Sequence, residues 1–201
     1  DIDWEQPVNV TEKNNLTIFI AELRQAFDDL YPDWIISMAV PVSNWSGQYY
    51  DFNQLKESVD FFNAMTYDIH GAWTDHAGHN SPLYQSPPGD PDGSVNTGIN
   101  YLVNTRGIES QKVNVGIPFY GKEYNTSGIN QAFTGDVVSR LYNEYHGLIN
   151  NGWNYIWDSN GQVPYLQNTS QNKIITIDDS LSVSIKSEYA ISNNLGGLMI
   201  W

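Results

Sequence analysis

The strongest constraint on the fold is a repeated change of pattern along the 201-residue chain, in which short apolar runs alternate with segments of helical periodicity. Alternation of this kind favours parallel βα units, because a parallel strand is reached from its neighbour through a helical crossover. The expected strands span residues 1–5, 34–42, 59–67, 112–117 and 196–201, and the expected helices span residues 11–30, 95–105 and 181–192.

The alternation stops between Tyr120 and Asp178. This stretch contains Gly-rich turns, a segment at 136–148 for which we expect a helix, and a short strand at 173–177. We therefore predict an inserted α+β subdomain within an α/β domain. The predicted parts are residues 1–119, the insertion at 120–178, and residues 179–201.

The composition excludes several classes of function. Asp and Glu number 23 against 9 Lys and Arg, so the formal net charge is -14 and nucleic acid is not an expected partner. The absence of cysteine excludes disulfides and thiolate chemistry, and no apolar run is long enough to cross a membrane. Seven Trp and thirteen Tyr supply flat rings that either stack on sugars or fill the core.

The first five residues place three carboxylates at a spacing of two. In a strand, Asp1, Asp3 and Glu5 would share one face, where their mutual repulsion costs stability. Such crowding raises carboxylate pKa values and is useful for acid–base catalysis. A solvated strand face is the plain alternative, and a Mg²⁺ or Ca²⁺ site is a weaker one because Trp4 and Pro7 do not form a cation loop.

Three histidines lie close together in the sequence, at His70, His76 and His79. Such a group raises the question of a zinc site. Their spacing matches no common ligand pattern, so the sequence predicts neither a bound metal nor another cofactor.

Five motifs, in this order, resemble those of the family 18 glycoside hydrolases, in particular the chitinases. The run Asp1-Ile2-Asp3-Trp4-Glu5 resembles the end of the DxxDxDxE motif on the fourth strand of a (β/α)8 barrel. The other four resemble the sixth strand, the loop after it, the seventh strand and the eighth strand. They are Met65-Thr66-Tyr67-Asp68 with His70-Gly71 and Trp73, then residues 78–84, 115–121 and 196–201.

The resemblance covers essentially the whole chain and sets its register. It implies an incomplete TIM barrel, strands four to eight, with an α+β insertion. Because a barrel without three strands has open edges, we expect residues 1–201 alone to fold poorly and to have little activity.

The resemblance also implies roles for the acidic residues. Glu5 would be the general acid that protonates the glycosidic oxygen and then the base that activates water. No protein carboxylate attacks the sugar in this family; the acetamido oxygen of the substrate does. Asp3 would orient the acetamido group, and Asp1 would share a proton with Asp3.

Further residues are assigned to the substrate by the same resemblance. Tyr67 would donate a hydrogen bond to the acetamido oxygen, and Asp68 would bind the same sugar. Ordinary packing is the alternative for the aromatic residues. The expected substrate contacts are Met65, Trp201, Tyr120 and Trp73.

The resulting prediction is a secreted, monomeric chitinase that acts on chitin or chitooligosaccharides by a retaining mechanism. An endo-β-N-acetylglucosaminidase of the same family and a chitinase-like lectin are the alternatives. A lectin is disfavoured because Glu5 is present. A sugar-binding module of another fold would not require the acidic strand.

Overall fold

The computed structural model describes all residues from Asp1 to Trp201. The chain forms two compact units, and each consists of several chain segments. The first unit contains Asp1–Met65, Gly98–Val115 and Ala190–Met199, and the second contains Thr66–Thr97, Gly116–Tyr189 and Ile200–Trp201.

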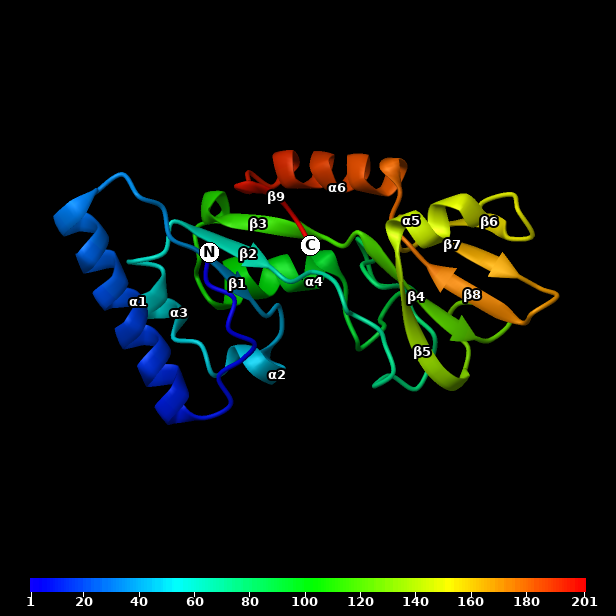
Figure 1. The fold of residues 1–201 in the computed structure, drawn as a ribbon, viewed down its shortest axis with the longest axis horizontal. Coiled ribbons are helices and arrows are strands. Elements are labelled where there is room, and N and C mark those ends of the chain that lie inside the picture. Colours follow the sequence, from blue (N-terminus) through cyan, green and yellow to red (C-terminus); the bar gives the residue numbers. More distant parts are fainter. The chain divides into compact units, whose positions relative to one another are not determined.

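A four-stranded sheet with the order β1-β2-β3-β9 organises the first unit (Figure 1). The β1–β2 and β2–β3 pairs are parallel, as the alternating pattern predicted. Its strands are β1 (Ser37–Val40), β2 (Phe61–Ala64), β3 (Val113–Ile117) and β9 (Gly197–Ile200).

A single parallel bridge joins Ile2 to Met38 on β1. The Ile2 N–H donates to the Ser37 carbonyl oxygen at 2.8 Å, and the Ala39 N–H donates to the Ile2 carbonyl oxygen at 2.9 Å. The strand predicted for residues 1–5 is therefore reduced to one bridged residue, although its direction and neighbour are those of a parallel strand.

The long helix of the first unit is α1 (Val10–Leu30). Asn9 begins it, because its side chain accepts a hydrogen bond from the Glu12 backbone N–H and satisfies a free donor of the first turn. Leu16 and Ile20 are fully buried. The α1 helix contacts α3 in this unit (Figure 1).

Several further helices lie between the strands in the sequence. A helix was predicted over 95–105, and this segment is an α-helix that continues into a π-helical turn. The remaining elements are α2 (Asn44–Gly47), α3 (Phe52–Leu55), α4 (Val95–Asn100), η1 (Tyr101–Thr105), η2 (Ser110–Lys112) and α6 (Ser180–Ser192).

A five-stranded sheet with the order β5-β4-β8-β7-β6 organises the second unit (Figure 1). All of its pairings are antiparallel, and every strand falls between residues 120 and 176. The strands are β4 (Tyr120–Asn125), β5 (Thr134–Leu141), β6 (Asn154–Asp158), β7 (Val163–Asn168) and β8 (Lys173–Thr176).

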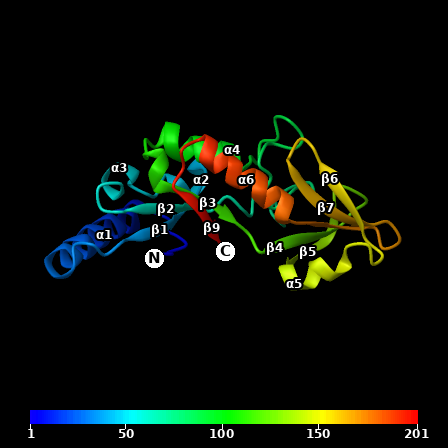
Figure 2. The ribbon, with the colours of Figure 1, turned by 90° about the horizontal axis from the view of Figure 1, so that it is seen from above.

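Two short helices, α5 (Tyr142–Tyr145) and η3 (His146–Leu148), follow β5, and α5 contacts β4 and β5 (Figure 2). The helix predicted over 136–148 is therefore wrong for its first half, which is strand. A core of Tyr145, Trp153 and aliphatic side chains supports this sheet.

None of the helices combines the length and the apolar character that crossing a membrane requires.

Candidate active site

In the acidic segment of the first unit, Asp1 directly precedes the bridged Ile2, and Asp3 and Glu5 follow it on its carboxyl side. Carboxyl ends of parallel strands carry the active sites of βα barrels. The Asp1 Oδ1 atom accepts hydrogen bonds from the Ser37 hydroxyl at 2.9 Å and from the Asn63 amide at 3.3 Å. Asn63 in turn accepts from the Asn114 amide at 2.9 Å, so Asp1 belongs to a polar chain that crosses the sheet.

Asp3 and Glu5, two residues apart, both influence the buried Tyr50. Burial raises the pKa of Tyr50, and the negative charges of Glu5 and Asp3 raise it further. The Tyr50 hydroxyl donates a hydrogen bond to the Trp4 carbonyl oxygen at 3.0 Å, between the two acidic residues. Tyr50 therefore holds the backbone from which Asp3 and Glu5 extend.

Sequence reasoning missed Tyr50. Its side chain is 1% exposed and lies 46 positions beyond Trp4, after a strand and a short helix. No local pattern distinguishes it from the partly exposed Tyr49 next to it. Only the tertiary hydrogen bond identifies it.

Met65, a predicted substrate contact, directly follows β2. Its backbone N–H donates to the Val40 carbonyl oxygen at 3.0 Å, which continues the parallel pairing beyond the strand. The residue is partly exposed. It therefore lies at the same carboxyl edge of the sheet that the barrel class uses for chemistry.

The second unit contains an aromatic group built from three predicted site residues. Tyr67 and Trp201 are stacked, with ring centroids 6.3 Å apart and an interplanar angle of 8°, and Tyr120 meets Tyr67 edge-on at 6.2 Å. Tyr67 is buried, whereas 55% of Trp201 is exposed. An exposed ring backed by a second ring is a surface on which the apolar face of a sugar can stack.

The backbone fixes the position of Trp201. Its N–H donates to the Ile117 carbonyl oxygen at 3.0 Å, and its carbonyl oxygen accepts from the Phe119 N–H at 2.8 Å. Tyr120 follows directly and starts β4. The residue after β9 and the first residue of β4 therefore carry the two outer rings of the aromatic group.

Asp68 lies beside this group and is exposed to solvent. Its Oδ1 atom accepts from the Tyr120 hydroxyl at 2.9 Å and pairs with the Lys122 ammonium group at 2.8 Å. Burial and the Asp68 carboxylate together raise the pKa of Tyr120, so this phenol stays protonated as a donor.

The backbone at Asp68 adopts φ +54°, an uncommon conformation for a residue other than glycine. The Asn80 side chain stabilises it, accepting from the Asp68 N–H at 3.0 Å and donating to the Tyr120 carbonyl oxygen at 3.0 Å. Asn80 thus connects the backbone at Asp68 to the first residue of β4.

Lys122 is a second residue that sequence reasoning missed. It is 8% exposed, and its ammonium group lies 5.6 Å from the Trp73 ring centroid and 5.2 Å from that of Tyr120. The Lys122 ammonium group interacts favourably with the faces of both rings, and its positive charge neutralises the Asp68 carboxylate. The available signal was its position two residues after Tyr120, because side chains at this spacing share one face of a strand.

A buried hydrogen-bonded group supports the loop that carries Asp68. The His79 Nε2 atom is 2.9 Å from the Asp158 Oδ2 atom, which also accepts from the Ser86 hydroxyl at 2.5 Å. Burial lowers the pKa of His79. Burial also raises the pKa of Asp158, but the hydrogen bonds from His79 and Ser86 outweigh this effect and leave it below the ordinary value.

The acidic residues of the first unit and the aromatic group of the second offer different kinds of chemistry. Asp1, Asp3 and Glu5 can accept and donate protons, whereas Tyr67, Asp68, Tyr120 and Trp201 offer a flat apolar surface with a hydroxyl and a carboxylate. None of these residues belongs to the one group of His and carboxylate side chains spaced to hold a metal ion, which lies at His70, His76, Asp90 and Asp92.

Parallel strands with carboxylates at their carboxyl edge, a group of stacked and exposed aromatic rings, and an inserted antiparallel sheet are together typical of a barrel glycosidase. The family model of the glycosyl hydrolases family 18 matches residues 1–201, and the chain belongs to this family. Its fold is a part of the family's TIM barrel with the antiparallel insertion sheet, as predicted.

Similar proteins span insects and bacteria. "Probable chitinase 2" from Drosophila melanogaster is 28% identical, and "Chitinase A1" from Niallia circulans is 30% identical, each over the whole of this chain. The crystal structure of the Ostrinia furnacalis Group IV chitinase in complex with allosamidin matches with a TM-score of 0.90 and 28% identity.

The chain spans less than half the length of these two curated relatives, 46% and 34% respectively, and 60% of the Ostrinia chain.

Proposed function

We propose that the protein is a chitinase that hydrolyses β-1,4 linkages between N-acetylglucosamine units with retention of configuration. The observation that carries this proposal is the acidic segment, in which Glu5 is present and Asp3, Glu5 and the Trp4 backbone share Tyr50 as a neighbour. The names of the relatives and the exposed Trp201 platform support the choice of substrate.

In the first proposed step, the Glu5 carboxylic acid donates its proton to the glycosidic oxygen. The bond between that oxygen and the anomeric carbon breaks, and the acetamido oxygen of the same sugar forms a bond to the anomeric carbon. Asp3 accepts a hydrogen bond from the acetamido N–H and stabilises the positive charge of the oxazolinium ion, and Asp1 assists Asp3 by sharing a proton.

In the second step, the Glu5 carboxylate takes a proton from water. The hydroxide oxygen bonds to the anomeric carbon and the oxazolinium ring opens, which restores the acetamido group and the protonated Glu5. Two inversions at one carbon give net retention. Tyr67 donates to the acetamido oxygen, and Asp68 binds the same sugar.

The remaining predicted residues form the binding surface in this proposal. Trp201 stacks under the reacting sugar, and Met65, Tyr120 and Trp73 contact it or its neighbours. Many rings and few cationic side chains suit a neutral polysaccharide. Secretion and a monomeric state accompany the proposal as expectations from the family.

The decisive experiment is Glu5→Gln in the complete protein that carries residues 1–201. The amide keeps the shape of the side chain but cannot donate and recover a proton, so kcat should fall about 10²–10⁴-fold. Affinity for an N-acetylated chitooligosaccharide, measured by titration calorimetry, should stay within a few-fold. Glu22→Gln on the exposed face of α1 is the matched control.

An unchanged kcat in the Glu5→Gln protein would reject the role of Glu5. NMR of the first product formed from a chitooligosaccharide should show the retained anomer, and an inverted product would reject substrate assistance. Binding without any hydrolysis by the wild-type protein would indicate a lectin. Release of glycans from a glycoprotein, with chitin left intact, would indicate an endo-β-N-acetylglucosaminidase.

A further inference from the structure

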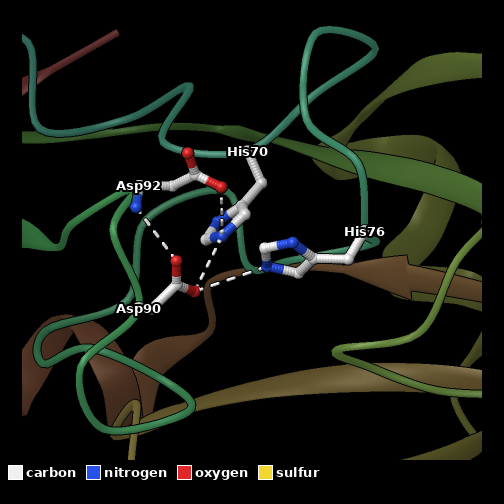
Figure 3. A group of neighbouring side chains, drawn as sticks. All are labelled: His70, His76, Asp90 and Asp92. Atoms are coloured by element: carbon white, nitrogen blue, oxygen red, sulfur yellow. Dashed lines mark hydrogen bonds and ion pairs between the residues drawn. The ribbon is translucent and has the colours of Figure 1, made fainter.

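Four side chains converge on the loop between β2 and α4, all within the second unit. They are His70, His76, Asp90 and Asp92 (Figure 3). One potential ligand atom from each lies within 4.8 Å of all the others. His70 and Asp90 are fully buried, and the Asp92 side chain is 32% exposed.

The separations between these atoms suit tetrahedral coordination. The His70 Nε2 atom is 3.0 Å from Asp90 Oδ2 and 3.6 Å from Asp92 Oδ2, and His76 Nε2 is 3.5 Å from Asp90 Oδ2. With ligand atoms roughly 2.0–2.1 Å from zinc, the edge of a coordination tetrahedron is roughly 3.3–3.4 Å long. The observed distances bracket this value.

The Nδ1 atoms of both histidines, which point away from the centre of the group, already form hydrogen bonds. His70 Nδ1 lies 2.9 Å from the His79 carbonyl oxygen, which can only accept, so Nδ1 carries the proton. His76 Nδ1 lies 2.7 Å from a carboxylate oxygen of Asp75. Hydrogen bonds of this kind orient metal-binding imidazoles and leave the Nε2 lone pair for the ion.

The inner atoms require a positive partner. The His70 Nε2 atom faces the Asp90 carboxylate at 3.0 Å, and this contact requires either a proton or a cation between the two atoms (Figure 3). His76 Nε2 is inaccessible to solvent and forms no hydrogen bond, because its 3.5 Å separation from Asp90 Oδ2 is too long for a good one. A buried nitrogen without a hydrogen bond costs about 1–3 kcal/mol, and one cation at the centre of the group would satisfy all four atoms.

We propose that His70, His76, Asp90 and Asp92 bind one divalent transition-metal ion, with Zn²⁺ preferred. Two imidazole nitrogens and two carboxylate oxygens suit zinc and its neighbours, whereas Ca²⁺ and Mg²⁺ favour oxygen alone. Its two positive charges balance the two carboxylates. Four protein ligands complete a tetrahedron, so the ion has a structural role.

Such an ion would close a loop in the chain. It ties the start of the loop, two residues after Asp68, to its end just before α4. The ordering would therefore extend to the backbone that presents Asp68. The inference stands independently of the proposed hydrolase activity.

In the sequence, His70, His76 and His79 lie close together, but with His79 as the third ligand their spacing matches no common metal-binding pattern. In the structure His79 turns to Asp158 instead, and the missing ligands are two aspartates 14 and 16 positions after His76. Only the path of the loop brings them to the histidines.

The test uses the complete protein after removal of metal with a chelator. Titration with Zn²⁺ should give one ion per chain by elemental analysis and raise the unfolding temperature. Co²⁺ as a substitute should give the intense visible absorption of tetrahedral coordination. His76→Gln and Asp92→Asn should each weaken Zn²⁺ binding at least 10- to 100-fold, since even outer partners of a ligand have effects of this size.

Matched controls are His146→Gln and Asp136→Asn, two exposed residues outside the group that should leave binding unchanged. Circular dichroism of the metal-free variants checks that they fold, and Asp92→Asn, at a partly exposed position, is the variant expected to fold normally. Absence of a one-to-one stoichiometry, absence of tetrahedral Co²⁺ bands, or equal Zn²⁺ affinity in the two ligand variants would each overturn the proposal. Equal affinity would assign the binding to surface carboxylates.

Discussion

At the scale of single residues, the catalytic proposal depends on side chains that do no chemistry themselves. Tyr50 holds the Trp4 carbonyl group, and Asp3 and Glu5 flank that point of the chain. A shift of about 1 Å in a reacting group can reduce a rate by about 10²-fold. Tyr50 is therefore a positioning residue for Glu5.

Tyr50→Phe removes one hydroxyl and keeps the ring. We expect a loss of about 1 kcal/mol in the free energy of unfolding, because one hydrogen bond is lost. We also expect kcat on a chitooligosaccharide to fall about 10-fold with KM nearly unchanged, since the acid is displaced while the sugar platform is intact. Steady-state kinetics beside the control Tyr49→Phe measures this; an equal drop in both variants, or none, contradicts the role.

At the scale of elements, close approach of two strands explains one glycine of the seventh-strand motif. A Cβ atom added at Gly121 would overlap the backbone carbonyl oxygen of Thr176, at the place where β4 pairs with β8. A backbone atom held in a ladder cannot move aside as the end of a side chain can. Gly121 is therefore required by the packing of β4.

Gly121→Ala should destabilise the protein by about 3 kcal/mol or more, in the range of strongly disruptive single substitutions. Chemical denaturation followed by circular dichroism measures the change. The control is Gly147→Ala, where an added Cβ meets no atom within 4 Å and the effect should stay near ±0.5 kcal/mol. A Gly121→Ala protein as stable as the control would show that β4 and β8 separate easily.

Sequence patterns predicted some helices and strands correctly and one segment wrongly. The parallel strands and α6 were predicted because their apolar periodicity is strong and their ends carry Pro or Gly. The segment at 136–141 was predicted as helix and is β5, a largely exposed edge strand. Its Val137-Val138 pair favours a strand, and pairing with β4 decides the outcome.

The residues of the candidate site also differ in whether the sequence alone could identify them. Residues inside ordered motifs, such as Glu5 and Asp68, could be named from the sequence. Tyr50 and Lys122 lie outside these motifs and could not, because their roles arise from contacts between segments that are distant in the chain or from the side on which a strand is exposed.

At the scale of the whole molecule, acid affects stability through a few buried groups before it neutralises the 23 carboxylates. His79 has a folded-state pKa below its ordinary value of about 6.5, because it is buried. The unfolded chain therefore binds a proton at His79 before the folded protein does. The stability from neutral His79 is present above about pH 6.5 and is lost as the pH falls towards the folded-state pKa.

In the metal-free protein, His76 acts in the opposite direction. Burial lowers its pKa, but Asp75, Asp90 and Asp92 outweigh this effect and raise it, so His76 gains stability as the pH falls. The difference between wild type and His79→Gln isolates the His79 contribution.

Between pH 7 and 5, wild type should lose stability relative to His79→Gln by up to about 1.4 kcal/mol per pH unit. The amide can still donate to Asp158 but does not titrate. Urea unfolding at a series of pH values measures the difference. Parallel curves for the two proteins would show that His79 takes up its proton equally in both states.

The backbone hydrogen bonds of Trp201 to Ile117 and Phe119 have a practical consequence for redesign. The position of this residue is set by its main chain, while more than half of its ring faces outward. Changing the ring to a smaller or more polar one should therefore alter the proposed sugar-stacking surface while the backbone hydrogen bonds that hold the residue stay in place.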